Sequence, residues 1–471
     1  IKSNFWAVRP ISTQGKERLF YQGKEILQGS DKKMLKLAIL GAGPGGYAAA
    51  LRGANLGFEV TLIEKEQLGG TCLNWGCIPT KTYYHSTKVL RELKELKELK
   101  GDYEIDYLAL FEKQKEVVKQ LVSGLEGLLK SAGVKVIKGQ GKLTKAGVLV
   151  NDKLIEADNT IIATGALPLL ILGIKPDAEN VFTAKEIWQL KRVPESVIIL
   201  GGGVIGVELA TIFSELGVKV TVVEKEKTIL PQFRTHAVRL VTKRLQAKGV
   251  ELKTNTLVTG YRDGVLETQT GNLTAEILLL ALGNKPNTTG LGLEELGVKL
   301  NEKKEIMVDA NLKTSINGIY AIGDVNNLTY KLAHAASHQG VSVVEKLAGL
   351  KVSFNEDLIP RTVFTDPELA EVGVLEGKKS RFPFSANGRA LASGINEGFI
   401  EVYGDQNKLN GVLLVGPEAS ELSNLASLAL AIGAQKEDLA RAIFTHPTLG
   451  EAFLEASLGL FGAAIHMVKR D

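Results

Sequence analysis

The sequence predicts an α/β fold with two Rossmann-like dinucleotide-binding units and a C-terminal α+β domain. Residues 35–64 and residues 197–224 carry most of this prediction, because each segment has a buried strand, a glycine-rich turn, a helix and a second strand in order. From about residue 353 the pattern changes to mixed strands and helices, which indicates a further domain.

The first unit places a G-x-G-x-x-G turn after the apolar strand at residues 37–40. Its glycines are Gly41, Gly43 and Gly46, and the next strand ends at Glu64, 64 − 41 = 23 positions after the first glycine. The glycines let a pyrophosphate approach the helix N-terminus, and the acid binds a ribose hydroxyl. The alternative is a glycine-rich turn without a ligand, which this βαβ context disfavours.

The second unit repeats the pattern after the strand at residues 197–200. Its glycines are Gly201, Gly203 and Gly206, and the acid is Glu224, at the same offset of 224 − 201 = 23. The chain therefore has two predicted dinucleotide sites.

Composition excludes several other classes of protein. The 471 residues suffice for two to four domains, and 44% hydrophobic with 23% charged residues is ordinary for a globular protein. No apolar run reaches the ~20 residues of a membrane span. A net charge of +4 is too small to indicate nucleic-acid binding. Two cysteines do not make a disulfide-stapled scaffold.

Both cysteines, Cys72 and Cys77, lie in one short segment. A regular helix would separate their Cα atoms by about 7.5 Å, whereas a disulfide wants roughly 4.4–6.8 Å. The segment must therefore bend if they pair, and Gly76 and Pro79 allow a bend. A following helix would lower the pKa of a nearby thiol. The alternative is two buried free cysteines.

The run Gly69-Gly70-Thr71-Cys72-Leu73-Asn74-Trp75-Gly76-Cys77-Ile78-Pro79-Thr80-Lys81 resembles the redox-disulfide segment of the flavin-dependent pyridine nucleotide–disulfide oxidoreductases, class I. The resemblance implies FAD in the first site and NAD in the second. It divides the chain into an N-terminal extension of unknown role (1–33), a FAD-binding domain (34–170), a NAD-binding domain (171–285), a return to the FAD-binding domain (286–352) and a dimerisation domain (353–471).

The resemblance also assigns further site residues. Thr164 and Gly165 end a strand similar to the family's crossing strand, and Gly323 and Asp324 match its second FAD motif. The resemblance also implies that Gly283 binds a cofactor. Lys81 and Glu208 are expected to pair near the flavin, and no metal site is predicted.

Glu224 favours NAD over NADP, because a carboxylate accepts hydrogen bonds from both ribose hydroxyls and repels a 2′-phosphate. Lys225 and Lys227 flank it, so NADP stays open as the alternative.

The segment Thr445-His446-Pro447-Thr448-Leu449-Gly450-Glu451 matches the family's H-P-T-x-x-E motif. A glutamate on one ring nitrogen of His446 would fix its tautomer and support its charge. The alternative is a surface histidine ahead of a helix. In the family this pair comes from the other subunit, so the resemblance implies a homodimer with an intersubunit active site.

The implied activity is oxidation of protein-bound dihydrolipoamide. His446, oriented by Glu451, deprotonates a substrate thiol, which attacks Cys72; Cys77 leaves as a thiolate, and electrons pass through FAD to NAD+. The implied partners are lipoylated carrier domains of 2-oxoacid dehydrogenase or glycine cleavage complexes. Alternatives are a glutathione-reductase-like enzyme and a flavin-bound scaffold or sensor.

Two segments depart from the family pattern. Residues 1–33 have no apolar core of a secretory signal, and we expect a cytoplasmic protein, or a matrix protein if the source is eukaryotic. Around residues 376–381 the chain is shorter than its relatives, and a helix is expected to be missing there.

Overall fold

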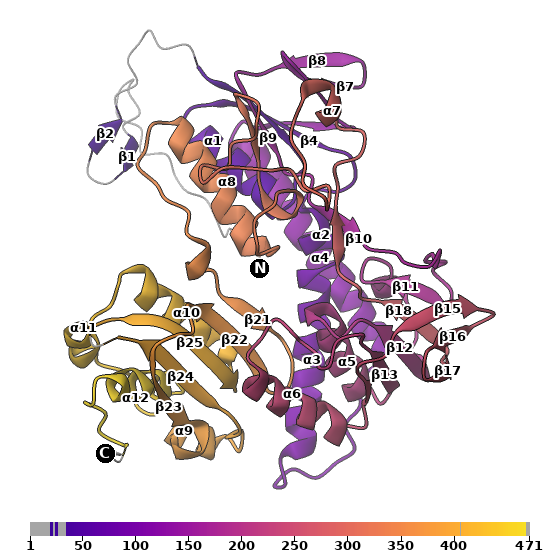
Figure 1. Ribbon diagram of the computed structural model, residues 1–471, viewed down its shortest axis with the longest axis vertical. Coiled ribbons are helices and arrows are strands. Elements are labelled where there is room, and N and C mark those ends of the chain that lie inside the picture. The colour runs from indigo at the N-terminus through magenta and orange to yellow at the C-terminus, as the bar shows by residue number, and fades with distance from the viewer. Residues whose placement is uncertain (1–18, 22–23, 27–33, 406, 468–471) are drawn as a thin grey trace, which may run out of the picture.

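The computed structural model describes residues 19–21, 24–26, 34–405 and 407–467. Three five-stranded sheets organise this part of the chain (Figure 1). We name the parts around them the N-terminal unit, the middle unit and the C-terminal domain, which lie at the top, lower right and lower left of Figure 1. The predicted extension lies outside the described residues, except for the paired strands β1 (Leu19–Tyr21) and β2 (Lys24–Ile26).

The N-terminal unit is a parallel sheet, as predicted. Its strand order is β20 (Ile319–Ala321), β9 (Asn159–Ile162), β3 (Lys36–Leu40), β4 (Glu59–Glu64) and β5 (Lys135–Lys138). Helices α1 (Pro44–Asn55) and α8 (Ala333–Leu347) pack closely together. A Cβ at Gly340 would lie 2.4 Å from the Gly45 carbonyl oxygen, so glycine is required at this crossing.

The middle unit is a second parallel sheet, again as predicted. Its order is β11 (Val181–Thr183), β18 (Ile277–Leu280), β12 (Ser196–Leu200), β13 (Lys219–Val223) and β14 (Glu251–Lys253), with helices α5 (Val204–Glu215) and α6 (Thr235–Ala247). The central strands are almost wholly apolar, as in sheets that are covered on both faces. The predicted α/β class is confirmed.

Two long helices, α3 (Cys77–Glu95) and α4 (Tyr107–Ser131), pack side by side between the N-terminal and middle units (Figure 1). The leucines at positions 90, 93, 96 and 99 recur every three residues but do not lie on one helix, because α3 ends at Glu95. Leu96 and Leu99 follow the helix and are 37% and 43% exposed.

The C-terminal domain is an antiparallel sheet with helices packed on it. The strand order is β21 (Arg361–Val363), β22 (Glu368–Gly373), β25 (Leu409–Gly416), β24 (Phe399–Gly404) and β23 (Lys378–Pro383). Helices α10 (Ala419–Ala431) and α12 (Gly450–Leu460) pack on it. Successive residues of its strands point to opposite faces of the sheet. One face belongs to a hydrophobic core shared with α6, and the other belongs to a core shared with α10 and α12.

The expected missing helix is confirmed, because only residues 374–377 join β22 to β23. These strands stand at positions two and five of the sheet, so the link crosses β25 and β24. Three strand spacings of ~4.8 Å require about 14 Å, and five residue steps of ~3.4 Å span at most about 17 Å. The link is therefore almost fully extended. It passes over Gly411, where a Cβ would lie 2.5 Å from the Val374 carbonyl oxygen.

A buried carboxylate joins α6 to the C-terminal sheet. Glu401 on β24 is 0% exposed and is bonded by Lys379, Arg381 and Tyr403. His236 on α6 lies 3.4 Å from the same carboxylate. Burial raises the pKa of Glu401, but the hydrogen bonds from Tyr403, Arg381 and Lys379 outweigh it and lower the pKa to about 2.

The remaining elements are small. They are the three-stranded sheets β6 (Lys142–Thr144), β7 (Gly147–Val150), β8 (Lys153–Glu156) and β15 (Val258–Arg262), β16 (Val265–Thr268), β17 (Gly271–Thr274), the pair β10 (Ala166–Pro168) and β19 (Asn284–Pro286), and helices α2 (Gly70–Asn74), α7 (Leu293–Leu296), α9 (Gly388–Ala392), α11 (Lys436–Arg441), η1 (Ile187–Gln189), η2 (Gly323–Val325), η3 (Glu356–Leu358) and η4 (Phe384–Ala386). Within the described ranges, no helix is both long and apolar enough to span a bilayer.

Candidate active site

The cysteine segment bends as predicted. Cys72 lies in the short helix α2, the backbone turns at Trp75 and Gly76, and Cys77 is the first residue of α3. Gly69 has φ = 89°, a left-handed conformation that favours glycine. Both cysteines are free thiols in this structure and are partly exposed. The sequence therefore placed the turn between the two sulfurs correctly.

The two thiols are electrostatically unequal. A hydrogen bond from the Cys72 thiol to Cys77 and burial both raise the pKa of Cys72 above its ordinary value. The same hydrogen bond lowers the pKa of Cys77, and the charge of Lys81 lowers it further, against the effect of burial. No side chain caps the N-terminus of α3, where Cys77 sits, and a helix N-terminus favours a thiolate. Cys77 is thus the sulfur that more readily carries negative charge.

Lys81 and Glu208 form the predicted pair. The Lys81 Nζ donates to the Glu208 Oε2 at 2.7 Å, from α3 to α5. The other oxygen, Glu208 Oε1, accepts the Phe364 backbone N–H at 3.0 Å. Lys81 Nζ also lies 4.1 Å from the centroid of the Phe364 ring. Contacts from α3, α5 and the segment after β21 therefore hold the Lys81 ammonium group in position beside the cysteines.

Tyr47 and two tryptophans lie around the cysteines and were not singled out from the sequence. Burial and negative charge at the two cysteines raise the pKa of Tyr47, a residue of α1. The Trp188 Nε1 donates to the Trp75 carbonyl oxygen at 2.9 Å, and Lys185 Nζ lies 4.5 Å from the Trp75 ring centroid. For Tyr47, its place directly after the glycine turn was the available signal.

The glycine turn of the N-terminal unit has the geometry of a dinucleotide site. Gly43 precedes α1, and a Cβ built on it would meet nothing within 4 Å, so the space before the helix is open. Gly46 is required for packing, because its Cβ would lie 1.8 Å from the Gly41 carbonyl oxygen. Glu64 Oε2 accepts the Ala42 N–H at 2.7 Å, which holds the carboxylate at the end of β4. These residues fit a bound dinucleotide.

Thr164 and Gly165 join this site where the predicted crossing strand ends. A cavity of about 60 Å³ is lined by residues that include Gly41, Glu64 and Thr164. Thr164 Oγ1 donates to the Asn287 carbonyl oxygen at 2.8 Å, and the Asn287 N–H donates to the Gly165 carbonyl oxygen at 2.9 Å. The predicted residues are therefore brought together from two distant segments.

Gly323 and Asp324 lie in η2, after β20. The Gly323 N–H donates to Gln339 Oε1 at 2.7 Å. Burial raises the pKa of Asp324, and Lys331 opposes this in part. A carboxyl group held there can accept a hydrogen bond from a hydroxyl group of a bound cofactor.

The middle unit repeats the arrangement. Gly203 precedes α5 with open space at its Cβ position, and Gly206 would place a Cβ 1.9 Å from the Gly201 carbonyl oxygen. Glu224 is 8% exposed, and its Oε2 accepts the Gly202 N–H at 2.7 Å. Gly283 lies before β19, and its carbonyl oxygen accepts the Leu169 N–H at 2.9 Å. The second unit therefore fits a dinucleotide in the same way as the first.

His446 and Glu451 form the predicted pair at the start of α12. His446 Nδ1 lies 2.9 Å from Glu451 Oε1, and the Thr448 N–H donates to Glu451 Oε2 at 2.8 Å. The His446–Pro447 peptide bond is cis. The His446 side chain is 79% exposed, and among the described residues no hydrogen bond or ion pair links it to either cysteine. One chain therefore does not bring both halves of the expected site together.

Comparison with known proteins defines the class. Residues 35–340 match the pyridine nucleotide-disulphide oxidoreductase family, and residues 359–457 match its dimerisation domain. The chain belongs to this family of flavoprotein disulfide oxidoreductases.

Its relatives point to one member of the family. The chain is 39% identical to a dihydrolipoyl dehydrogenase of Thermus scotoductus, covering 93% of this chain and 100% of the relative. It is 37% identical to a dihydrolipoyl dehydrogenase of Haloferax volcanii, covering 92% and 98%. The structure of LpdA from Mycobacterium tuberculosis is similar with a TM-score of 0.85 at 30% identity, covering 91% and 100%.

Proposed function

We propose that this protein is a dihydrolipoyl dehydrogenase that uses FAD and NAD+ and works as a homodimer on lipoylated carrier domains. The observation that carries the proposal is the presence, in one chain, of the unequal Cys72–Cys77 pair and the His446–Glu451 pair. The extended similarity to dihydrolipoyl dehydrogenases supports it.

The first chemical step is removal of a proton from a substrate thiol. Glu451 occupies Nδ1 of His446, which leaves Nε2 to accept that proton. Burial raises the pKa of Glu451, but the Thr448 N–H and His446 outweigh it and lower the pKa, so the carboxylate stays charged. It can therefore stabilise the imidazolium that forms on His446.

The second step is disulfide exchange in the oxidised enzyme. The substrate thiolate attacks the Cys72 sulfur, the Cys72–Cys77 bond breaks, and Cys77 leaves as a thiolate. The second substrate thiol then attacks the mixed disulfide, which yields the cyclic disulfide of lipoamide and returns Cys72 as a thiol. The raised pKa of Cys72 and the lowered pKa of Cys77 support this division of roles.

FAD supplies, when bound, a two-electron acceptor for the dithiol and a donor of hydride to NAD+. Lys81, held by Glu208, lies beside Cys77 and lowers the pKa of that thiol. Glu224 supports NAD+ rather than NADP+, because its buried carboxylate lies where a ribose 2′-phosphate would be repelled.

A second subunit is needed to complete the site. Leu428, Ile432 and Ile443 are 60%, 69% and 98% exposed on and after α10, close in the chain to His446. Apolar side chains exposed to this extent are candidates for burial against a partner subunit. A partner subunit that packs on these side chains would bring His446 of one chain close to the cysteines of the other.

The reaction is tested by assaying oxidation of free dihydrolipoamide and of a dihydrolipoyl carrier domain, with NAD+ and NADP+ side by side. We expect NAD+-dependent turnover of both substrates and none in Cys72→Ser. Full activity in that variant, or reduction of glutathione disulfide in preference to lipoamide, would contradict the assignment.

The intersubunit site is tested by mixing inactive His446→Gln and Cys72→Ser subunits after dissociation. Half of randomly re-formed dimers are mixed and contain one intact site, so about a quarter of the wild-type activity should return. A site contained within one chain would give no recovery.

A further inference from the structure

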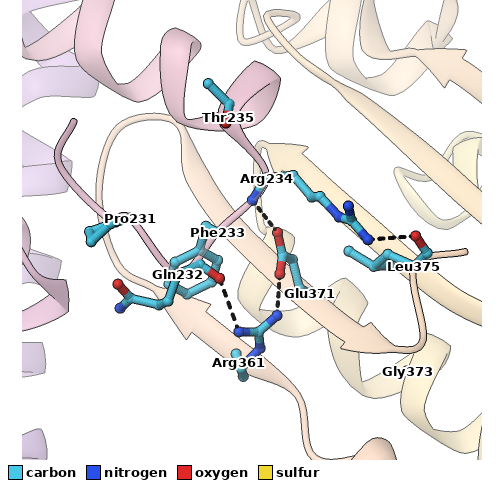
Figure 2. A pocket seen from close by; sticks show the side chains of 9 residues that line it. All are labelled: Pro231, Gln232, Phe233, Arg234, Thr235, Arg361, Glu371, Gly373 and Leu375. Carbon is cyan, nitrogen blue, oxygen red and sulfur yellow. Dashed lines mark hydrogen bonds and ion pairs between the residues drawn. The ribbon is translucent and has the colours of Figure 1, made fainter. Parts of the chain in front are cut away.

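A cavity of about 370 Å³ lies between the middle unit and the C-terminal domain, apart from the cysteines and both glycine turns. Figure 2 shows the side chains around it. One wall is the loop that leads into α6, and the other is formed by β21, β22 and the extended link after β22. Its lining residues are Pro231, Gln232, Phe233, Arg234, Thr235, Arg361, Glu371, Gly373 and Leu375.

Two arginines and one glutamate determine the charge of this cavity. Glu371 is 2% exposed, and its two oxygens are taken by the Arg234 backbone N–H at 2.8 Å and by the Arg361 guanidinium. This carboxylate therefore compensates one arginine only. The second guanidinium, that of Arg234, has no carboxylate partner within the described ranges and donates to the Leu375 carbonyl oxygen at 2.6 Å.

Donor groups remain on both guanidinium groups. Each guanidinium has five N–H donors. Arg361 uses donors on Glu371 and, at 3.2 Å, on the Gln232 carbonyl oxygen. Its guanidinium also lies 5.2 Å from the ring centroids of both Phe233 and Tyr330. The cavity is thus a polar space with held, cationic donors and a net positive charge.

The extended link forms one edge of this space. Residues 374–377 connect β22 to β23 without a helix, and of these four residues only Leu375 lines the cavity. The link presents the Leu375 carbonyl oxygen to Arg234, which turns that side chain along the cavity wall (Figure 2).

We propose that this cavity binds a small organic anion through a phosphate or carboxylate group held between Arg234 and Arg361. Guanidinium groups bind such oxyanions with charge-assisted hydrogen bonds. The volume exceeds that of a single oxyanion, so the ligand carries an uncharged body as well. It contacts both the middle unit and the C-terminal domain.

The test is isothermal titration calorimetry of the FAD-loaded protein. The probes are inorganic phosphate, glycerol 3-phosphate and succinate, each with saturating NAD+ so that the nucleotide sites are filled. We expect one saturable site per chain with a Kd below about 10 mM for at least one probe. Preference for glycerol 3-phosphate indicates a phosphate ester, and preference for succinate indicates a carboxylate.

Arg234→Gln removes the guanidinium without a carboxylate partner and should weaken binding at least about tenfold. Arg239→Gln is the matched control, because Arg239 is exposed on α6, carries the same charge and does not line the cavity. A double variant, Arg361→Gln with Glu371→Gln, removes the second guanidinium without leaving a buried charge unpaired, and should also weaken binding.

Three results would overturn the proposal. They are absence of saturable binding by all three probes, unchanged binding in Arg234→Gln, and equal weakening in Arg234→Gln and Arg239→Gln. None of these readouts depends on catalytic turnover, so the proposal stands or fails separately from the dehydrogenase assignment.

Discussion

Replacing Lys81 with methionine should raise the pKa of Cys77. Lys81 follows Cys77 by one helical turn of α3, and its charge lowers the pKa of that thiol. Side chains four residues apart on a helix lie about 5–6 Å from each other. Coulomb's law with an effective dielectric constant of about 20 then gives an attraction of about 3 kcal/mol between the Lys81 ammonium group and a Cys77 thiolate, which the substitution removes. The carboxylate of Glu208, left without Lys81, acts in the same direction.

The assay uses a Cys72→Ser background, which leaves Cys77 as the single thiol of the chain. The rate of its alkylation by iodoacetamide, measured against pH, reports the pKa. Glu208→Gln should move that pKa in the opposite direction, since the carboxylate raises it. Lys94→Met, an exposed lysine farther along α3, is the control and should change nothing. An unchanged or lowered pKa in Lys81→Met would refute the reasoning.

Three other substitutions test separate contacts. Glu451→Gln removes the charge that orients His446, so kcat for dihydrolipoamide should fall about 10²-fold while flavin absorbance shows full FAD content; an unaltered kcat would count against His446 as the base. Gly206→Ala forces a methyl to 1.9 Å from the Gly201 carbonyl oxygen, so NADH binding, followed by fluorescence, should weaken, and wild-type affinity would contradict this. Glu401→Gln should lower the unfolding free energy by about 2 kcal/mol at pH 7. This figure is reduced from the full effect of the pKa shift, because solvent screens the exposed partners Lys379 and Arg381.

The pH dependence gives the Glu401 prediction its sign. Its pKa is about 2 in the folded protein and 4.5 as an ordinary glutamate. The stabilisation is therefore complete above pH 4.5 and is lost as the pH falls towards 2. Thermal melts of wild type and variant should differ at pH 7 and converge as the pH is lowered from 4.5 towards 2. A difference that stays constant over this range would show that the charge is not responsible.

Features encoded by neighbouring residues were predictable. The two βαβ units follow from apolar strands, glycines and an acid at a fixed offset, and the bend at Gly76 follows from the reach of a disulfide. The His446–Glu451 contact also lies within five positions. Such features depend on local geometry, so the sequence is sufficient to find them.

Contacts between distant segments were found only by resemblance or not at all. Lys81 and Glu208 were paired by resemblance, but Phe364, which binds the other oxygen of Glu208, had no sequence signal. The same is true of Arg234 and Glu371, which come from different units.

By itself, the sequence determined that this protein has two dinucleotide-binding folds, a cysteine pair on a bend and a histidine held by a glutamate. The tertiary structure decided how unequal the two thiols are and where the link after β22 leaves a cationic cavity. The physical reason is the separation along the chain over which each effect acts. Periodicity and turn chemistry act between residues near in the chain, whereas pKa shifts and cavities depend on which distant side chains the sheet order brings into contact.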